Sequence, residues 1–295
     1  MAVIQPTPKR GFISKIFISS DEPRLRAGWR LLLQTLLLIL LTIPVSLLAG
    51  LIPATGDGLF TGQIIELIIF TSSIYIARRL LDKRTFVSLG FQVNKQAFAD
   101  VFIGIAITFV MMGLIYLAEV AAGWLTFESF AWQTEPINNV MISVLSVFVV
   151  FIFVGYNEEL LSRGYHLQTI ATGTNMFWGV LISSIIFGIA HGGNPNATWV
   201  SAVGIFFAGI FLAYGYICTG RLWLSIGLHI GWNFFEGVVF GFPVSGLDIY
   251  RLMRHQVHGP EIWTGGAFGP EAGLIVLPAL MIGSIFIHLY TRHRN

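Results

Sequence analysis

The feature that most constrains this chain is an uncharged apolar run, "LLLQTLLLILLTIPVSLLAGLI", at residues 31–52. Its length is close to the roughly 20 residues that a helix needs to cross a bilayer. The composition agrees, because 55% of the residues are hydrophobic and 11% are charged, whereas soluble domains have about 25% charged residues. The sequence therefore predicts an integral membrane protein and excludes a soluble globular domain.

Similar apolar segments recur along the whole chain, and polar turns separate them. They predict an all-α fold of about eight transmembrane helices, in a single domain at 31–295 that follows a basic segment at 1–30. The expected spans are 31–53, 60–81, 98–124, 138–157, 177–191, 200–218, 222–240 and 272–290.

The distribution of basic residues predicts the orientation of these spans. With the N-terminus in the cytoplasm, 15 of the 17 Lys and Arg residues lie on the cytoplasmic side, and only Arg251 and Arg254 lie outside. Cytoplasmic loops of membrane proteins carry such an excess. We therefore expect both termini to be cytoplasmic. Separately, we expect the membrane to be a prokaryotic plasma membrane.

Ionisable residues inside apolar segments are the main indication of function, because each costs about 2.5–3.5 kcal/mol to insert into a membrane. The segment "NEELLSR" contains Glu158, Glu159 and Arg163. Arg163 follows Glu159 by four residues, so the two share a helix face and can form an ion pair. Glu158 points about 100° away from this face. This division predicts one structural carboxylate and one chemical carboxylate.

Two further apolar segments carry polar residues at the same spacing. In "FGIAH", Phe187 and His191 are four residues apart, and in "HIGWN" the same spacing separates His229 from Asn233. Each pair therefore lies on one face of its helix. We expect the two Glu, the two His and the Asn to converge on one buried pocket.

The expected depths of these groups support convergence. A polar turn, "ATGTN", surrounds Gly173, with Glu158 15 residues before it and His191 18 residues after it. At about 1.5 Å per residue, these groups lie roughly 22 and 27 Å from the turn. A hairpin at Gly173 thus brings them to similar heights, provided that the fourth helix continues past Arg163.

Other polar residues receive a simpler interpretation. We expect single residues in spans to be structural or to face a cavity, and polar residues of the loops to form turns. On this interpretation His166 lies near the cytoplasmic surface. The residues in question are Glu66, Glu119, His166, Asn194 and Asn196.

The three segments resemble, in order and spacing, the signature of the CPBP family of intramembrane proteases. This family includes the CAAX prenyl endopeptidases and prokaryotic relatives linked to bacteriocin processing or immunity. The matching motifs are EExxxR at Glu158–Arg163, FxxxH at Phe187–His191 and HxxxN at His229–Asn233. The similarity covers roughly 150–240, and we expect a protease-like core at about 138–240.

The resemblance implies a role for each matching residue. Glu158 and His191 would activate a water molecule against the scissile carbonyl, since both residue types suit general base catalysis. His229 and Asn233 would donate hydrogen bonds to the developing oxyanion. The protein is accordingly expected to be a CAAX-protease-like endopeptidase.

The resemblance also bears on which residues orient the catalytic groups and on whether the site holds a metal ion. Glu159 and Arg163 would orient the catalytic groups. Carboxylate and imidazole ligands can also bind Zn²⁺, and the candidate ligands here would be Glu158, His191 and His229. Activation of water by Glu and His needs no metal ion, so the leading interpretation requires no cofactor.

Three classes of function therefore remain to be compared. The first is an endopeptidase that acts on membrane-associated or lipid-modified peptides, with membrane lipid as its surroundings and no nucleic-acid partner. The second is a non-proteolytic scaffold, such as a bacteriocin-immunity protein. The third is a transporter, because Glu and His relays also line ion paths, although the chain lacks the internal repeat typical of many transporters.

Overall fold

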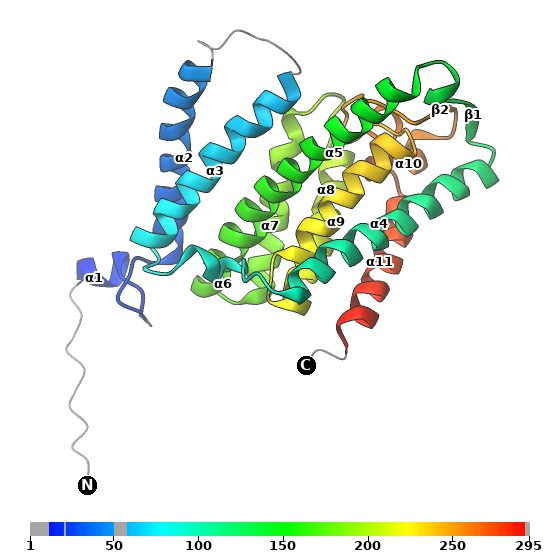
Figure 1. Ribbon diagram of the computed structural model, residues 1–295. Coiled ribbons are helices and arrows are strands. Elements are labelled where there is room, and N and C mark those ends of the chain that lie inside the picture. The colour runs from blue at the N-terminus through cyan, green and yellow to red at the C-terminus, as the bar shows by residue number, and fades with distance from the viewer. Residues whose placement is uncertain (1–11, 21, 50–57, 293–295) are drawn as a thin grey trace.

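The computed structural model describes residues 12–292, apart from residue 21 and residues 50–57. Within these residues it is an all-α polytopic membrane protein, as the apolar segments predicted. The start of the predicted basic segment, 1–11, and the end of the first predicted span, 50–53, lie outside the described residues. The long helices run roughly alongside one another (Figure 1), and they are α2 (Ala27–Ala49), α3 (Gly58–Leu80), α4 (Lys95–Ala121), α5 (Ile137–Glu159), α7 (Met176–Ala190), α8 (Trp199–Thr219), α9 (Trp223–Asn233) and α11 (Val276–Thr291).

All eight predicted spans contain one of these helices, but they differ in length. Among the described residues, six helical segments are long and apolar enough to cross a membrane. The other two predicted spans form α11, which is shorter and apolar, and α9 with its continuation. The prediction of about eight spans therefore matches the number of apolar segments, whereas six of them meet the full-length criterion.

The fourth span extends well beyond the length of a membrane crossing. Helix α5 continues through a π-helical segment at Leu160–Leu167 into α6 (Gln168–Gly173), which gives one helical segment of 37 residues. The turn then reverses the chain, and the side chain of Asn175 caps α7 by accepting from the backbone N–H of Trp178. Both the extension past Arg163 and the hairpin at Gly173 are thus present as expected.

Two pairs of helices approach so closely that only small residues fit between them. A Cβ atom on Gly104 of α4 would lie 2.5 Å from the backbone N of Leu228 on α9, and one on Gly227 would lie 2.3 Å from the carbonyl oxygen of Val101. Likewise, a Cβ atom on Gly188 of α7 would lie 2.5 Å from a carbonyl oxygen of α8. Such backbone-to-backbone contacts are typical of helices packed in membranes, and they fix α9 and α7, which carry the two motif histidines.

The remaining elements lie at the two ends of the bundle. Helix α1 (Phe12–Phe17), α6 and the C-terminal end of α11 lie at one end, and we name the opposite end the loop end (Figure 1). At the loop end, β1 (Leu125–Phe130) pairs antiparallel with β2 (Met253–Val257), and these strands were not expected from the apolar pattern. Short helical turns complete this region, namely α10 (Glu261–Thr264), Gly266–Phe268 and Pro270–Ala272.

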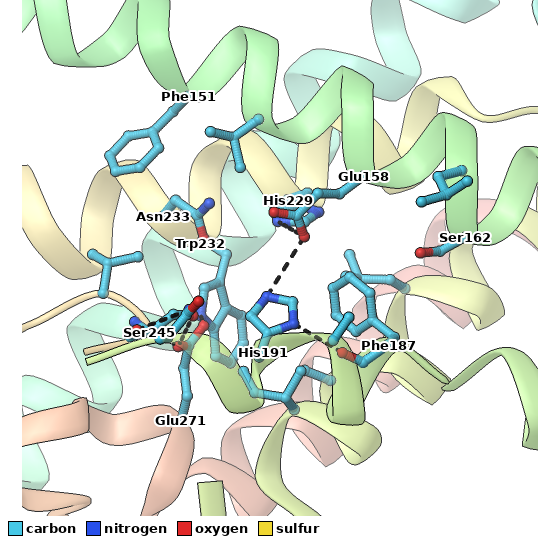
Figure 2. A pocket seen from close by; sticks show the side chains of 18 of the residues that line it. Phe151, Glu158, Ser162, Phe187, His191, His229, Trp232, Asn233, Ser245 and Glu271 are labelled. Carbon is cyan, nitrogen blue, oxygen red and sulfur yellow. Dashed lines mark hydrogen bonds and ion pairs between the residues drawn. The ribbon is translucent and has the colours of Figure 1, made fainter. Parts of the chain in front are cut away.

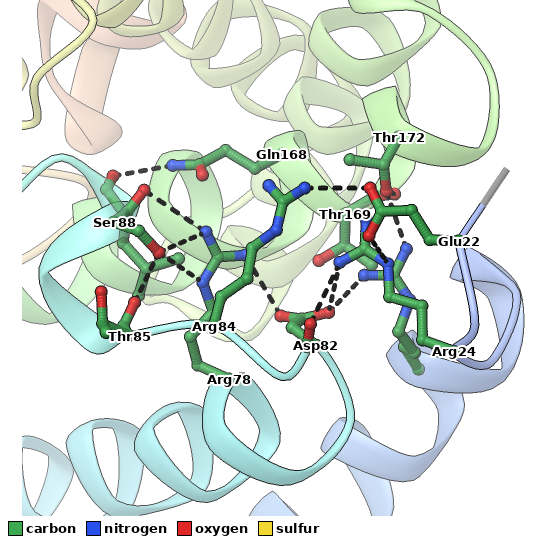
Figure 3. Close-up of polar contacts among 12 residues, drawn as sticks. Glu22, Arg24, Arg78, Asp82, Arg84, Thr85, Ser88, Gln168, Thr169 and Thr172 are labelled. Atoms are coloured by element: carbon green, nitrogen blue, oxygen red, sulfur yellow. Dashed lines mark hydrogen bonds and ion pairs between the residues drawn. The ribbon is translucent and has the colours of Figure 1, made fainter.

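A buried ionic network lies at the end opposite the loop end (Figure 3). Asp82, directly after α3, accepts hydrogen bonds from the guanidinium groups of Arg30 and Arg78, and it also forms an ion pair with Arg24 at 3.7 Å. Arg30 donates in addition to the hydroxyl of Thr172 at 2.7 Å. The network therefore connects α2, α3 and α6 at a single carboxylate.

Candidate active site

The two adjacent carboxylates at the end of α5 have different surroundings. Glu159 is fully buried, and its Oε1 atom lies 2.7 Å from Nη1 of Arg163. Arg163 also donates to the carbonyl oxygen of Gly209 at 2.9 Å, and its guanidinium lies 4.3 Å from the ring centre of Phe187. The predicted Glu159–Arg163 pair is present, and Phe187 supports the arginine from the neighbouring helix.

Glu158 faces the opposite way, into a cavity. Its side chain is 28% exposed, and its Oε2 atom lies 3.6 Å from Nε2 of His191 and 3.8 Å from Nε2 of His229. Among the described residues, none makes a hydrogen bond to this Oε2 atom. Glu158 therefore presents to two imidazole rings a carboxylate oxygen that makes no hydrogen bond to them.

His191 ends α7, where its ring is held by its own helix. The Nδ1 atom lies 2.8 Å from the carbonyl oxygen of Phe187. A carbonyl oxygen only accepts, so Nδ1 carries the proton of this hydrogen bond. In the neutral ring, Nε2 is then an acceptor, and it is the atom that faces Glu158.

His229 lies on α9 and is held by the buried carboxylate. Its Nδ1 atom lies 2.8 Å from Oε1 of Glu159, the same oxygen that accepts from Arg163. Its Nε2 atom points toward Glu158. Asn233 follows one helical turn later, is 6% exposed and lines the same cavity. Glu159 thus orients His229, while Glu158 stays available to bind a molecule in the cavity.

The cavity that contains these groups has a volume of about 380 Å³ (Figure 2). All four predicted catalytic residues line it, whereas the predicted orienting residues Glu159 and Arg163 lie behind its wall. Most of the remaining lining is apolar and comes from α3, α5, α7, α8 and α9. The polar residues that also line it are Gln63, Glu66, Ser162, His166, Asn194, Ser245 and Glu271.

Several of these lining residues were not expected at the site. His166 lines the cavity instead of lying near the surface, because the π-helical segment changes which residues of this stretch face inward. Asn194, interpreted as a turn residue, donates to the carbonyl oxygen of Ser245. Ser245 and Glu271 belong to the long loop before α11, where no periodic pattern or motif indicated a role.

Two of the three motif helices, α5 and α9, change their winding directly beside the site. The π-helical segment Leu160–Leu167 begins immediately after Glu159, and a second one at Phe234–Val239 begins immediately after Asn233. π-Helical turns are rare and occur frequently at functional sites. The π-helical segments therefore indicate a functional site next to Glu159 and Asn233, whichever residue types stand there.

The fit of a metal ion can be judged from the donor groups. Glu158, His191 and His229 are suitable ligand types for Zn²⁺. Across the part of the chain that the structure describes, however, no group of three or more His, Cys, Asp or Glu side chains is arranged to hold a metal ion. We therefore derive no step through a metal ion.

Two comparisons with known proteins bear on the family of this chain. Residues 140–235 match the family model of the type II CAAX prenyl endopeptidase Rce1-like proteins. The chain is also 31% identical over 137 residues to a Bacillus subtilis (strain 168) protein named "Putative membrane peptidase YdiL". That alignment covers 46% of this chain, and the chain spans about half the length of this curated relative. The region that the family model matches contains all three motifs, and the two comparisons confirm the predicted resemblance of this chain to the CPBP family of membrane peptidases.

Proposed function

We propose that this protein is an intramembrane endopeptidase in which Glu158 and His191 activate a water molecule. The observation that carries the proposal is the position of Glu158 Oε2, which faces Nε2 of both His191 and His229 in one cavity. The other nitrogen of each ring is already bonded to a fixed acceptor. Two imidazoles and one free carboxylate are thus oriented toward the same point.

The proposed reaction begins with a water molecule bound between Glu158 and His191. The two facing atoms are 3.6 Å apart, so one water molecule can hydrogen bond to both from the cavity side. As its oxygen adds to the carbonyl carbon of the peptide, its proton passes to this pair. The pair then returns a proton to the leaving nitrogen when the C–N bond breaks, which balances the hydrolysis.

Stabilisation of the oxyanion is assigned to His229 and Asn233. The amide of Asn233 can donate directly, and His229 can donate from Nε2 when both ring nitrogens carry protons. In that state Nδ1–H bonds Glu159 while Nε2–H faces the cavity. Removal of one oxyanion donor typically costs about 10²–10³ in kcat. Glu159 and Arg163 hold this part of the site in place.

The proposed substrate is a membrane-associated or lipid-modified peptide. The cavity lies between spanning helices, and apolar residues such as Phe151, Phe211 and Trp232 line much of it. We further propose that both termini are cytoplasmic in a prokaryotic plasma membrane. The excess of Lys and Arg on one side supports that orientation.

The proposal can be tested with purified protein in lipid. The wild type, Glu158→Gln and His191→Ala would each receive a quenched, lipidated peptide library, and Glu128→Gln on β1 would serve as a control carboxylate outside the cavity. We expect cleavage by the wild type and the control only. Absence of cleavage by a folded wild type would instead favour a non-proteolytic scaffold.

A chelator added to the same assay addresses the metal ion. We expect the rate of cleavage to stay unchanged, because the proposed chemistry uses only Glu158, His191, His229 and Asn233. A rate that falls with chelator and recovers on addition of Zn²⁺ would contradict the metal-independent mechanism and would assign the ion to the first three of these residues.

A further inference from the structure

Glu271, in the short helical turn before α11, has an unusual position for a loop carboxylate. It is only 5% exposed, it lines the cavity, and it lies close enough to His191 and His229 to interact electrostatically with both. Its oxygens accept three hydrogen bonds, from the indole N–H of Trp232 at 2.9 Å and from the backbone N–H and hydroxyl of Ser245 at 2.9 and 2.6 Å.

These hydrogen bonds connect Glu271 to both motif histidines through other residues. Trp232 follows His229 by three residues on α9. Ser245 accepts at its carbonyl oxygen from the side chain of Asn194 at 3.0 Å, and the backbone N–H of Asn194 donates to the carbonyl oxygen of His191 at 3.1 Å. A continuous path therefore leads from one carboxylate to the turn of His191 and to the helix of His229, and Figure 2 shows Trp232, Ser245 and Glu271 of this path.

The segment that Glu271 holds has a backbone conformation that requires support. Ser245 has a positive φ of 47°, which is uncommon for a residue with a side chain. Gly246 follows with a φ of 82°, and a Cβ atom there would lie 1.8 Å from the carbonyl oxygen of Pro195. Residues held in such conformations persist when surrounding contacts determine them, and two of the three hydrogen bonds to Glu271 come from Ser245.

We propose that Glu271 is a positioning residue of the peptidase site: it holds the Ser245 turn against Asn194 and thereby fixes the end of α7 that carries His191. This inference rests on the proposed function. Glu271 is distinct from the groups assigned to water activation, because its oxygens are occupied by Trp232 and Ser245. It acts on the reaction through the placement of His191 relative to Glu158.

The first test compares Glu271→Gln with a matched control. Glutamine keeps the size of the side chain but replaces one acceptor oxygen with an N–H₂ group, which cannot accept from Trp232 or Ser245. We expect kcat per folded molecule to fall about 10- to 100-fold, because small misplacements of catalytic groups have effects of this size. KM should change less than about twofold, since uniform substrate binding is retained.

The control is Asn196→Gly, because the backbone at Asn196 has a positive φ of 57°, which glycine adopts without strain. Asn196 connects the same two loops through an exposed hydrogen bond to the carbonyl oxygen of Ala267 at 3.4 Å, but it does not line the cavity. We expect its kcat to remain within about twofold of the wild type. Asn194→Ala should resemble Glu271→Gln, and the double variant should lose less than the product of the two single losses, because both changes break the same path.

Hydrogen–deuterium exchange provides a readout that does not depend on activity. In Glu271→Gln we expect faster exchange at 191–198 and 244–247, and unchanged exchange around Asp82. Unchanged kcat together with unchanged exchange would overturn the proposal, as would a loss of activity explained entirely by a smaller folded fraction. If the wild type cleaves nothing, the proposed function fails, and exchange alone decides whether Glu271 holds the turn of His191.

Discussion

Among the described residues, the carboxylate–arginine cluster around Asp82 and the one around Glu159 differ in how completely their carboxylates are paired. In the cluster opposite the loop end, Asp82 is shared by three arginines, Arg24, Arg30 and Arg78, and its side chain has no exposed surface (Figure 3). In the cluster formed by the EExxxR motif, Arg163 pairs with Glu159 alone, and the adjacent Glu158 faces a cavity.

The difference separates a structural function of buried charge from a chemical one. A buried charge is tolerated when it is paired and hydrogen bonded, and the surroundings of Asp82 meet this condition fully. Glu158 meets it only in part, because one of its oxygens is left facing two imidazoles. An unsatisfied group of this kind is expected where a substrate or a water molecule supplies the missing partner.

The largest expected effect is that of Glu158→Gln on catalysis. The amide has nearly the same shape but cannot accept a proton, so kcat should fall about 10³-fold, within the range of general base catalysis. The midpoint of thermal unfolding should change little, because Glu158 Oε2 lies 3.6 and 3.8 Å from the two imidazoles and makes no hydrogen bond to them. Steady-state kinetics on a cleaved peptide and a melting curve in lipid measure both. A strong loss of stability would instead mean that Glu158, like Asp82, mainly stabilises the fold.

The converse substitution is Asp82→Asn. It leaves three arginines near a neutral side chain, and breaking a buried ion pair in this way costs about 3–5 kcal/mol of unfolding free energy. The kcat of the folded protein should stay unchanged, since the network lies outside the cavity. Denaturant titration in mixed micelles measures the stability. Asp248→Asn removes the exposed pair with Arg251 and should cost less than about 1 kcal/mol, so an equal cost for both variants would contradict the comparison.

Arg163→Lys tests the link between the two types of carboxylate. Lysine keeps the charge but lacks the planar fork that reaches Glu159 and the carbonyl oxygen of Gly209 together. Glu159 would then hold the ring of His229 less firmly, and we expect kcat to fall about 10- to 100-fold. Single-turnover kinetics would show whether the chemical step is affected. A change confined to KM would instead assign Arg163 to substrate binding.

The smallest expected effect concerns His255 on β2. This residue is buried as an uncharged imidazole, whereas Asp82 is buried as a charged group in ion pairs. Its ring lies against Tyr116 and Phe242, and burial lowers its pKa to about 4. The unfolded chain, with a pKa near 6.5, therefore binds more protons between these values, so stability is lost as the pH falls. From pH 7 to pH 5 the loss should be about 2 kcal/mol at most.

The variant His255→Phe should reduce this pH dependence, because phenylalanine has no proton to bind. Melting temperatures of the wild type and the variant at pH 7 and pH 5 measure the difference. Identical pH dependence in both proteins would mean that other groups cause the acid sensitivity. It would contradict the interpretation that His255 is buried as a neutral imidazole.

The sequence predicted those features that depend on local spacing. The Glu159–Arg163 pair and the shared faces of Phe187 with His191 follow from a separation of four residues on a helix. The hairpin at Gly173 followed from the positions of its polar residues. These predictions succeeded because helical geometry relates sequence distance directly to spatial distance.

The parts that could not be predicted depend on contacts between distant segments. The role of Asn194 arises from its contact with Ser245, 51 residues later, and that of Glu271 from loop packing without periodicity. The π-helical segment after Glu159 is likewise set by tertiary packing, and it directs His166 inward. No local pattern encodes these arrangements, so only the folded structure reveals them.

The glycine contacts between helices have a mechanical consequence for the site. His229 is carried by α9, which lies backbone to backbone on α4 at Gly104 and Gly227, whereas His191 is carried by α7, which is matched in the same way to α8 at Gly188. We therefore expect each pair of helices to move as one body, because no flexible side chain separates its backbones at these contacts. The separation of the two imidazoles would then follow the angle between these two bodies, and because helix tilt responds to bilayer thickness, we expect the thickness of the surrounding bilayer to affect the active site.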